Sequence, residues 1–153
     1  MSVTVRRVVA ADAPALFLLV EQFPTPTACP EKTFDVLLES KLKDPRSCII
    51  VAELDGALIG YVSGSVRTAF YAAGATAWVD EILVLPELRR GGVGHQLMSA
   101  FETWAADNRS VLVALATRGA TNFYEKLGYE SRAGYFKKYL AADVPSSSRE
   151  SKR

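Results

Sequence analysis

Cysteine, histidine and net charge are all scarce in this sequence. Its two cysteines, Cys29 and Cys48, and its one histidine, His95, lie in unrelated segments and form no metal-ligand spacing, which favours a reduced intracellular protein without a metal site. A net charge of +1 excludes a strong general attraction to nucleic acid or to an anionic membrane. No apolar run approaches the roughly 18 residues of a membrane helix, and the first residues, MSVTVRR, lack the apolar stretch of a secretory signal. We therefore expect a cytoplasmic location and neither a nucleic-acid nor a membrane partner.

Hydrophobic residues, by contrast, are plentiful. At 153 residues and 49% hydrophobic composition, the chain is long enough for about one domain with one core. Low complexity is confined to the stretch ADVPSSSRESKR, whose serine and charge content does not support a core. We expect one folded domain over residues 1–140 and a flexible tail over residues 141–153.

The spacing of apolar residues predicts strands and helices in the order β-α-α-β-β-β-α-β-α-β. Prolines in the stretch PTPTACP, residues 24–30, predict an irregular loop between the first two helices. The chain is thus predicted to have an α/β fold, a mixed and mostly antiparallel twisted sheet with flanking helices. The predicted strands are 3–8, 47–54, 57–71, 75–86, 111–117 and 133–140, and the predicted helices are 11–23, with Asp12 as N-cap, 31–44, 92–108 and 118–128.

The segment PELRRGGVGHQL, residues 86–97, places two arginines and three glycines at the entrance of a predicted helix. A helix N-terminus attracts anions, because its first N–H groups lack partners and its dipole is positive there. Glycines let a phosphate approach the backbone closely. A P-loop would need Lys and Ser or Thr where His95 and Gln96 stand, and the dinucleotide pattern would need glycine at Leu97.

The loop and a second motif together resemble the GNAT superfamily of acetyl-coenzyme A dependent N-acetyltransferases. The pattern Q/R-x-x-G-x-G/A stands at residues 89–94, and the pattern A-x-x-x-Y-x-K-x-G-F/Y begins at Ala120 and runs to Tyr129. Both motifs occur in the family's order, and the resemblance covers about residues 3–140. It implies a sheet with splayed strands around a cofactor cleft, acetyl-coenzyme A as cosubstrate, and its pyrophosphate on the arginine–glycine loop.

The same resemblance implies a set of cofactor-binding residues. In relatives, the strand before the loop binds the pantetheine arm through its backbone, and the loop and first helical turn bind the pyrophosphate. Many relatives also carry an asparagine where this chain has Thr117, which either binds the cofactor through its hydroxyl or caps the following helix. The residues implied are Ile82, Leu83, Val84, Arg89, Arg90, Gly91, Gly92, Val93, Gly94, His95, Thr117 and Tyr124.

Three residues are candidates for catalysis. The resemblance places Tyr124 near the sulfur as general acid for the leaving thiolate; the alternative is a core aromatic. Asp80 and Glu81 precede the pantetheine strand, and a carboxylate there would accept a proton from the incoming ammonium, or else form a surface ion pair. Because successive strand side chains alternate, only one of the two is expected to face the thioester unless a bulge intervenes.

The resemblance therefore implies an N-acetyltransferase that passes the acetyl group directly to a primary amine of a small molecule, peptide or protein. Neither cysteine lies in a motif that activates a thiolate, so a covalent intermediate has no evident carrier. The competing class is a non-catalytic acyl-coenzyme A binding or sensing module. The acceptor pocket is expected from residues 23–34, the start of the Trp78 strand and the last strand, with Phe70, Tyr71, Trp78 and Tyr135 as candidate lining residues; a homodimer is an open alternative.

Overall fold

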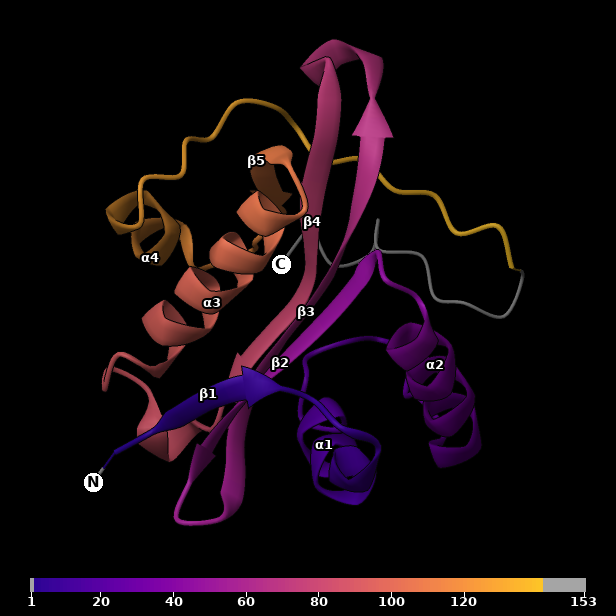
Figure 1. The fold of residues 1–153 in the computed structure, drawn as a ribbon, viewed down its shortest axis with the longest axis vertical. Helices are drawn as coiled ribbons and strands as arrows, with labels where there is room; N and C mark the ends of the chain where they lie inside the picture. The colour runs from indigo at the N-terminus through magenta and orange to yellow at the C-terminus, as the bar shows by residue number, and fades with distance from the viewer. Residues whose placement is uncertain (1, 142–153) are drawn as a thin grey trace.

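The protein folds around a twisted sheet of five strands in the order β1-β2-β3-β4-β5, which the computed structural model describes within residues 2–141 (Figure 1). The first four strands pair antiparallel in succession, whereas β5 pairs with β4 in parallel. This arrangement confirms the predicted α/β fold with a mixed, mostly antiparallel sheet. The strands are β1 Thr4–Arg7, β2 Ser47–Leu54, β3 Ala57–Ala69, β4 Gly74–Val84 and β5 Ser110–Leu115.

The helices cover both faces of the sheet (Figure 1). Helices α1 and α2 pack on one face, which we call the α1–α2 face, and α3 packs on the other, the α3 face, with α4 beside it. Strand β2 is buried over its first six residues, of which residues 48–52 are all apolar, as expected of a strand covered on both faces. The helices are α1 Ala13–Val20, α2 Glu31–Lys43, α3 Val93–Asp107 and α4 Thr121–Lys126.

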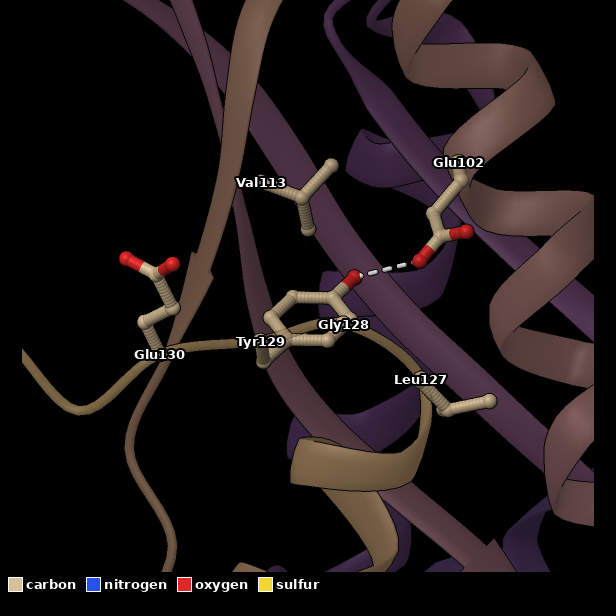
Figure 2. Close-up of a pocket in the computed structure, with 6 residues that line it drawn as sticks. All are labelled: Glu102, Val113, Leu127, Gly128, Tyr129 and Glu130. Atoms are coloured by element: carbon tan, nitrogen blue, oxygen red, sulfur yellow. Dashed lines mark hydrogen bonds between the residues drawn. The ribbon is translucent and has the colours of Figure 1, made fainter.

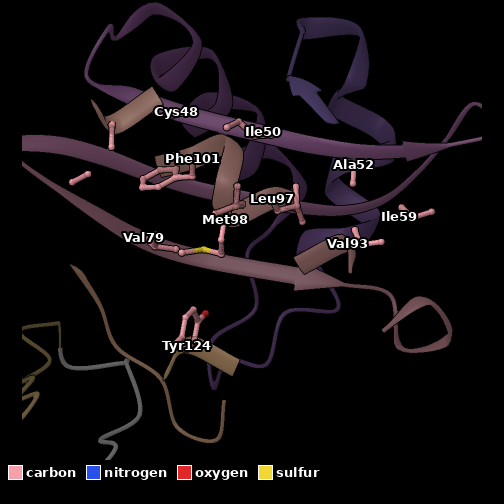
Figure 3. Packing of buried hydrophobic residues seen from close by; sticks show 13 residues of the cluster. Cys48, Ile50, Ala52, Ile59, Val79, Val93, Leu97, Met98, Phe101 and Tyr124 are labelled. Carbon is pink, nitrogen blue, oxygen red and sulfur yellow. The ribbon is translucent and has the colours of Figure 1, made fainter. Parts of the chain in front are cut away.

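Each face has its own apolar cluster. On the α3 face, Leu97 and Phe101 of α3 are fully buried against Ile50 and Val62 of the sheet (Figure 3). On the α1–α2 face, side chains of α1 and α2 pack against side chains of β2, β3 and β4: Leu16, Leu19, Phe34, Leu38, Val51, Tyr61 and Leu83. Membership of these two clusters shows to which side each strand residue points.

Strand β4 contains a bulge next to the predicted site. Ser63 of β3 lies opposite Glu81, but the next residue, Gly64, lies opposite Val79, so Asp80 is the extra residue of β4. A Cβ atom on Gly64 would lie 2.3 Å from the carbonyl oxygen of Trp78. Only glycine allows the strands to approach so closely at this point, which makes Gly64 part of the bulge.

The bulge places two acidic side chains on one side of the sheet. Val79 and Ile82, on either side of the acid pair, both pack in the α3-face cluster, and Leu83 packs in the opposite cluster. Since the chain takes one extra step between Val79 and Ile82, Asp80 and Glu81 both lie on the α1–α2 face. The sequence predicts that only one of the two acids faces the thioester unless a bulge intervenes. The bulge does intervene here, so both acids lie on the same face.

Beyond the bulge, β4 and β5 separate. Their parallel pairing runs from Ala75 opposite Ser110 to Val79 opposite Leu115, where β5 ends. After the unpaired Asp80, residues 81–84 of β4 continue to pair with β3 along the other edge. We call the place where the two strands part the splay; it confirms the predicted divergence of the sheet.

Two predicted elements differ in the structure. The strand expected at 133–140 is wrong: within the last described part of the chain, residues 131–141, no strand forms. Its alternating pattern is real, but a strand also needs a neighbouring backbone to pair with, and Phe136 and Leu140 are 94% and 93% exposed. The helix expected at 118–128 is shorter, and Gly128 ends it in the left-handed conformation with φ +92°.

The predicted cap of the first helix also behaves differently. Asp12 stands at the N-cap position of α1, but its carboxylate accepts hydrogen bonds from the Val9 amide and, at 2.8 Å, from both terminal nitrogens of Arg6. The Arg6 guanidinium lowers the pKa of Asp12 for that reason. Asp12 thus fastens β1 to the start of α1. Residues 142–153 of the predicted tail lie outside the described residues.

Candidate active site

The arginine–glycine loop joins the end of β4 to α3. Arg90 and Gly92 both have left-handed backbone, with φ of +70° and +84°. Glycine adopts this conformation without strain, whereas arginine does so at a cost. The loop turns the chain so that α3 starts beside the free edge of β4, on the far side of the splay from β5.

The first turn of α3 leaves backbone donors available at this place. The first hydrogen bond of the helix runs from the Gln96 amide to the Gly92 carbonyl, at 3.0 Å. The N–H groups of Val93, Gly94 and His95 therefore have no hydrogen-bond partner within the helix. Together with the dipole of a 15-residue helix, they are the donors available to the anion that the sequence predicts at this loop. The His95 side chain is exposed, so its amide is the relevant group.

The two arginines of the loop are placed differently. The Arg89 side chain turns back, and its Nε donates to the Val84 carbonyl at 2.9 Å. This bond ties the loop to β4 and uses a carbonyl that was expected to be offered to pantetheine. Arg90 is exposed at the rim, where its charge is available to a phosphate. Ile82 and Leu83 retain the role of the unpaired strand edge at the splay.

The environment of the acid pair raises the pKa of both carboxyls. Glu81 is half-buried, and its pKa is raised first by burial and then by the charge of Asp80, while Lys41 of α2 lowers it. The carboxyl of Asp80 is more exposed; the surrounding protein still raises its pKa, against Lys41 and Arg67. A carboxylate with a raised pKa binds a proton more readily, as a general base must.

Tyr124 lies on the other side of the splay. It is 7% exposed and packs in the α3-face cluster with Val79, and Figure 3 shows its ring directed from α4 towards β4. Burial raises the pKa of the phenol, so it carries its proton at neutral pH. The rings of Phe123 and Tyr129 meet it edge-on at 5.0 and 5.8 Å and hold it in place.

Helix α4 brings Tyr124 close to the loop. A Cβ atom on Gly94 would lie 3.1 Å from the Phe123 ring, so glycine allows the start of α3 to pack against α4. Thr117 lies just before α4, and its hydroxyl accepts the Ala120 amide at 3.1 Å. Thr117 therefore organises the turn before α4, whose N-cap is Ala120 and which has no side-chain cap, so its cofactor role stays a prediction.

Aromatic side chains extend the site on the α1–α2 face. Trp78 lies two residues before the bulge and stacks on Tyr135 at 6.4 Å, and the Arg67 guanidinium lies 5.6 Å from the Trp78 ring centre. The described terminal segment thus reaches this face without forming a strand. Phe70 and Tyr71 are not brought to this wall: they lie at the exposed tip of the β3–β4 hairpin, 105% and 78% exposed.

One cavity lies away from this site (Figure 2). It measures about 360 Å³ and lies between α3, β5 and the chain that follows α4. In it, the Tyr129 hydroxyl donates to Glu102 Oε2 at 2.7 Å, so this acid is already engaged (Figure 2). A second cavity, of about 290 Å³, lies between β1 and α3, where Arg7 stacks near Trp104. Neither cavity includes the loop, the acid pair or Tyr124.

Sequence reasoning missed three contributions to the site. Lys41 of α2 and Tyr61 of β3 both interact electrostatically with Glu81, and no motif marks either. The sequence predicts the bulge only as an exception to the alternation of strand side chains. One signal for it was present, because a glycine inside a strand, here Gly64, is typical of a bulge.

A helix N-terminus beside an unpaired strand edge suits an anionic ligand with an arm that pairs along the strand. Residues 15–129 match the model of the acetyltransferase (GNAT) family. The chain belongs to this family and is an N-acetyltransferase, as the sequence predicts, rather than a non-catalytic module. Membership of the family implies acetyl-coenzyme A as the acetyl donor.

Individual relatives agree with this assignment. The chain is 26% identical to the uncharacterized N-acetyltransferase YhfO of Bacillus subtilis (strain 168), over 93% of this chain and 98% of the relative. Glucosamine-6-phosphate N-acetyltransferase from Arabidopsis thaliana shares the fold with a TM-score of 0.82 at 18% identity, covering 92% of this chain and all of that one. AAC(6')-Iy, solved with the bisubstrate analog CoA-S-monomethyl-acetylneamine, has a TM-score of 0.79 at 21% identity over the same shares.

Two further observations concern metal binding and membrane-spanning helices. Within residues 2–141, histidine, cysteine and acidic side chains form no group of three or more that is placed to hold a metal ion. None of the helices in that part of the chain is both long and apolar enough to cross a membrane.

The loop geometry generates a prediction about Gly92. Replacing Gly92 by alanine forces a side chain into left-handed backbone and is expected to cost about 1 kcal/mol of unfolding free energy. The loop relieves that strain by turning its amides, so affinity for coenzyme A is expected to fall roughly tenfold or more. Isothermal titration calorimetry and urea unfolding on the same preparation measure both quantities.

Gly56 provides a matched control. It has φ +81°, and, as at Gly92, an added Cβ would meet no atom within 4 Å, but it lies in the β2–β3 turn. Gly56→Ala is expected to lose similar stability and to bind coenzyme A like the parent. Equal affinities in Gly92→Ala and the parent would show that the loop does not bind the cofactor.

Proposed function

We propose that the acetyl group is transferred directly from acetyl-coenzyme A to a primary amine at the splay, with Glu81 as proton acceptor and Tyr124 as proton donor. The observation that carries the proposal is the bulge at Asp80. It puts the acid pair on the α1–α2 face of β4, while Tyr124 approaches the same part of β4 from the α3 face. Base and acid thus lie on opposite sides of the place where the strands part.

The residues present fit acetyl-coenzyme A at this place. The leftover amides of Val93, Gly94 and His95 suit the pyrophosphate, Arg90 adds charge at the rim, and the edge of β4 at Ile82 and Leu83 suits the pantetheine amides. When bound, acetyl-coenzyme A supplies an acetyl thioester whose leaving group is a thiolate. Gly91 and Gly92 leave room around the loop because they carry no side chain.

Glu81 is the better base of the two acids. An ammonium has no lone pair, so a proton must leave the amine before it attacks, and a Glu81 carboxylate oxygen accepts it. Burial and the neighbouring Asp80 charge both raise the pKa of Glu81, which strengthens it as a base. Asp80, more exposed, then serves to attract the cationic amine and to support the charge balance with Lys41.

Tyr124 completes the transfer on the other side. Its phenol is protonated at neutral pH, and its hydroxyl donates the proton to the departing sulfur.

Neither cysteine offers a covalent alternative. Cys48 is 1% exposed, and burial raises the pKa of its thiol to about 11, so it carries little thiolate at neutral pH.

The acceptor is proposed to be a primary amine of a small molecule or of a peptide. The wall formed by Trp78, Tyr135 and Arg67 lies on the acid-pair side of β4, where an amine must approach Glu81. Flat aromatic surface next to carboxylates suits a cationic amine on a ring or an alkyl chain. Relatives named for aminoglycoside and amino-sugar acetylation make such amines the first to assay.

Binding and turnover test the proposal together. Acetyl-coenzyme A at a hundredfold excess over its Kd is expected to stabilise the fold by about 2.7 kcal/mol, which a thermal melt detects. A panel of amines, followed by release of free thiol, is then expected to identify at least one substrate. An unchanged melt at millimolar cofactor would contradict the donor assignment, and binding without turnover of any amine would contradict catalysis.

Substitution of Tyr124 tests the proton donor. Tyr124→Phe keeps the ring in the cluster but removes the hydroxyl, so kcat is expected to fall about 100-fold, at the low end for loss of a general acid, with cofactor affinity nearly unchanged. Tyr129→Phe is the control, because it removes a hydroxyl that is bonded to Glu102 instead. Loss of stability with normal turnover in Tyr124→Phe would assign Tyr124 to the core alone.

We also propose a homodimer, supported by exposed aromatic surface. The hairpin tip and the terminal segment expose Phe70, Tyr71, Phe136 and Leu140, more apolar surface than isolated side chains explain. Light scattering is expected to give twice the 16.6 kDa of one chain, and a monomer mass at micromolar concentration would contradict the proposal.

The near-neutral net charge supports a cytoplasmic location without nucleic-acid or membrane partners, which cell fractionation checks.

A further inference from the structure

Tyr61 of β3 carries a buried hydroxyl that the fold leaves free. Its side chain is 1% exposed, and its ring packs in the α1–α2 face cluster against Leu83 and the helices. Within residues 2–141, the hydroxyl has no hydrogen-bond partner. A buried hydroxyl without a partner costs free energy, and phenylalanine would fill the same space without that cost. The phenol oxygen therefore calls for an explanation other than packing.

The strand register places this hydroxyl on the same side as the proposed base. Tyr61 lies opposite Leu83, and Ser63 lies opposite Glu81, all on the α1–α2 face. Tyr61 and Glu81 are thus diagonal neighbours across an antiparallel pair, at a separation that a tyrosine and a glutamate side chain can span. The bulge is necessary for this neighbourhood, because without it Glu81 would point to the α3 face.

We propose that Tyr61 is a positioning residue for Glu81: its phenol donates a hydrogen bond to the Glu81 carboxylate and holds it towards the splay. The role of Glu81 as base rests on the proposed function; the Tyr61–Glu81 bond does not require it. Two acidic residues lie two positions from a strand partner of Tyr61, Glu81 on β4 and Glu53 on β2. Glu53 is already bound by Arg6 at 2.9 Å, whereas the Glu81 charge acts on the Tyr61 phenol.

The charges around Glu81 define the sign of the effect. Asp80 from β4 raises the pKa of Glu81, Lys41 from α2 lowers it, and Arg67 from β3 acts on Asp80. Burial and the Glu81 charge raise the pKa of Tyr61, so the phenol remains a donor throughout the working range. A donor to the carboxylate stabilises its charged form, so its removal raises the pKa of Glu81.

The test compares the pH dependence of kcat/KM in the parent and in Tyr61→Phe. The acidic limb is expected to move to higher pH by about half a unit to one unit in the variant, because the carboxylate loses a donor to its charged form. Ser110→Ala is the matched control, because the Ser110 hydroxyl is also buried without a partner in the described chain and lies opposite Ala75, five residues before Asp80. Its limb is expected to coincide with that of the parent.

A second measurement separates this inference from the proposed function. Carbon-13 NMR titration of the glutamate side-chain carboxyls, with Glu81 assigned from Glu81→Gln, reports the Glu81 pKa without any turnover. A higher Glu81 pKa in Tyr61→Phe than in the parent supports the inference even if no amine is acetylated. An identical pKa in both proteins overturns it, even if the enzyme is active and Glu81→Gln abolishes the acidic limb.

Discussion

The extra residue in β4 is the constraint on which the site depends. With regular alternation from Val79, the Glu81 side chain would point into the apolar cluster under α3, and Ile82 would point away from it. The bulge reverses both, so that a carboxylate and its neighbour face α2 while the apolar residues stay buried. A bulge also increases local twist, which accounts for the separation of β4 from β5 directly after Val79. Gly64 permits this geometry, because any Cβ there would collide with the Trp78 carbonyl.

Most of the fold was predictable because its signals are local. The strands of the meander, the turn at Asp55–Gly56 and the long helix after Gly92 follow from apolar spacing and glycine positions, and they form where the sequence predicts them. The prediction of a strand at 133–140 was wrong, because strand pairing depends on residues that are distant in the sequence. An alternating segment becomes a strand only when another backbone offers hydrogen bonds, and within the described chain these residues meet only side chains, such as Trp78 against Tyr135.

The candidate site divides in the same way. The loop of Arg89–Gly94 and the tyrosine of α4 belong to contiguous motifs, so the resemblance identified them directly. Tyr61, Lys41 and the shared direction of the two acids depend on strand register and on helix packing, which bring together residues distant in the sequence. The bond from Arg89 to the Val84 carbonyl was equally hidden, because a motif describes the type of residue at a position but not the direction of its side chain.

Three residues of the loop and of the acid-pair side break local rules, although others, Asp55, Ala73, Arg109 and Ser110, do so elsewhere. Arg90 has a left-handed backbone, Tyr61 buries an unbonded hydroxyl, and Glu81 is half-buried beside a second acid. The pKa of Glu81 is higher in the fold than in the unfolded chain, so the fold favours its protonated form; above that pKa its ionisation reduces stability. A chain selected for stability alone would replace each of these residues with a better-suited one.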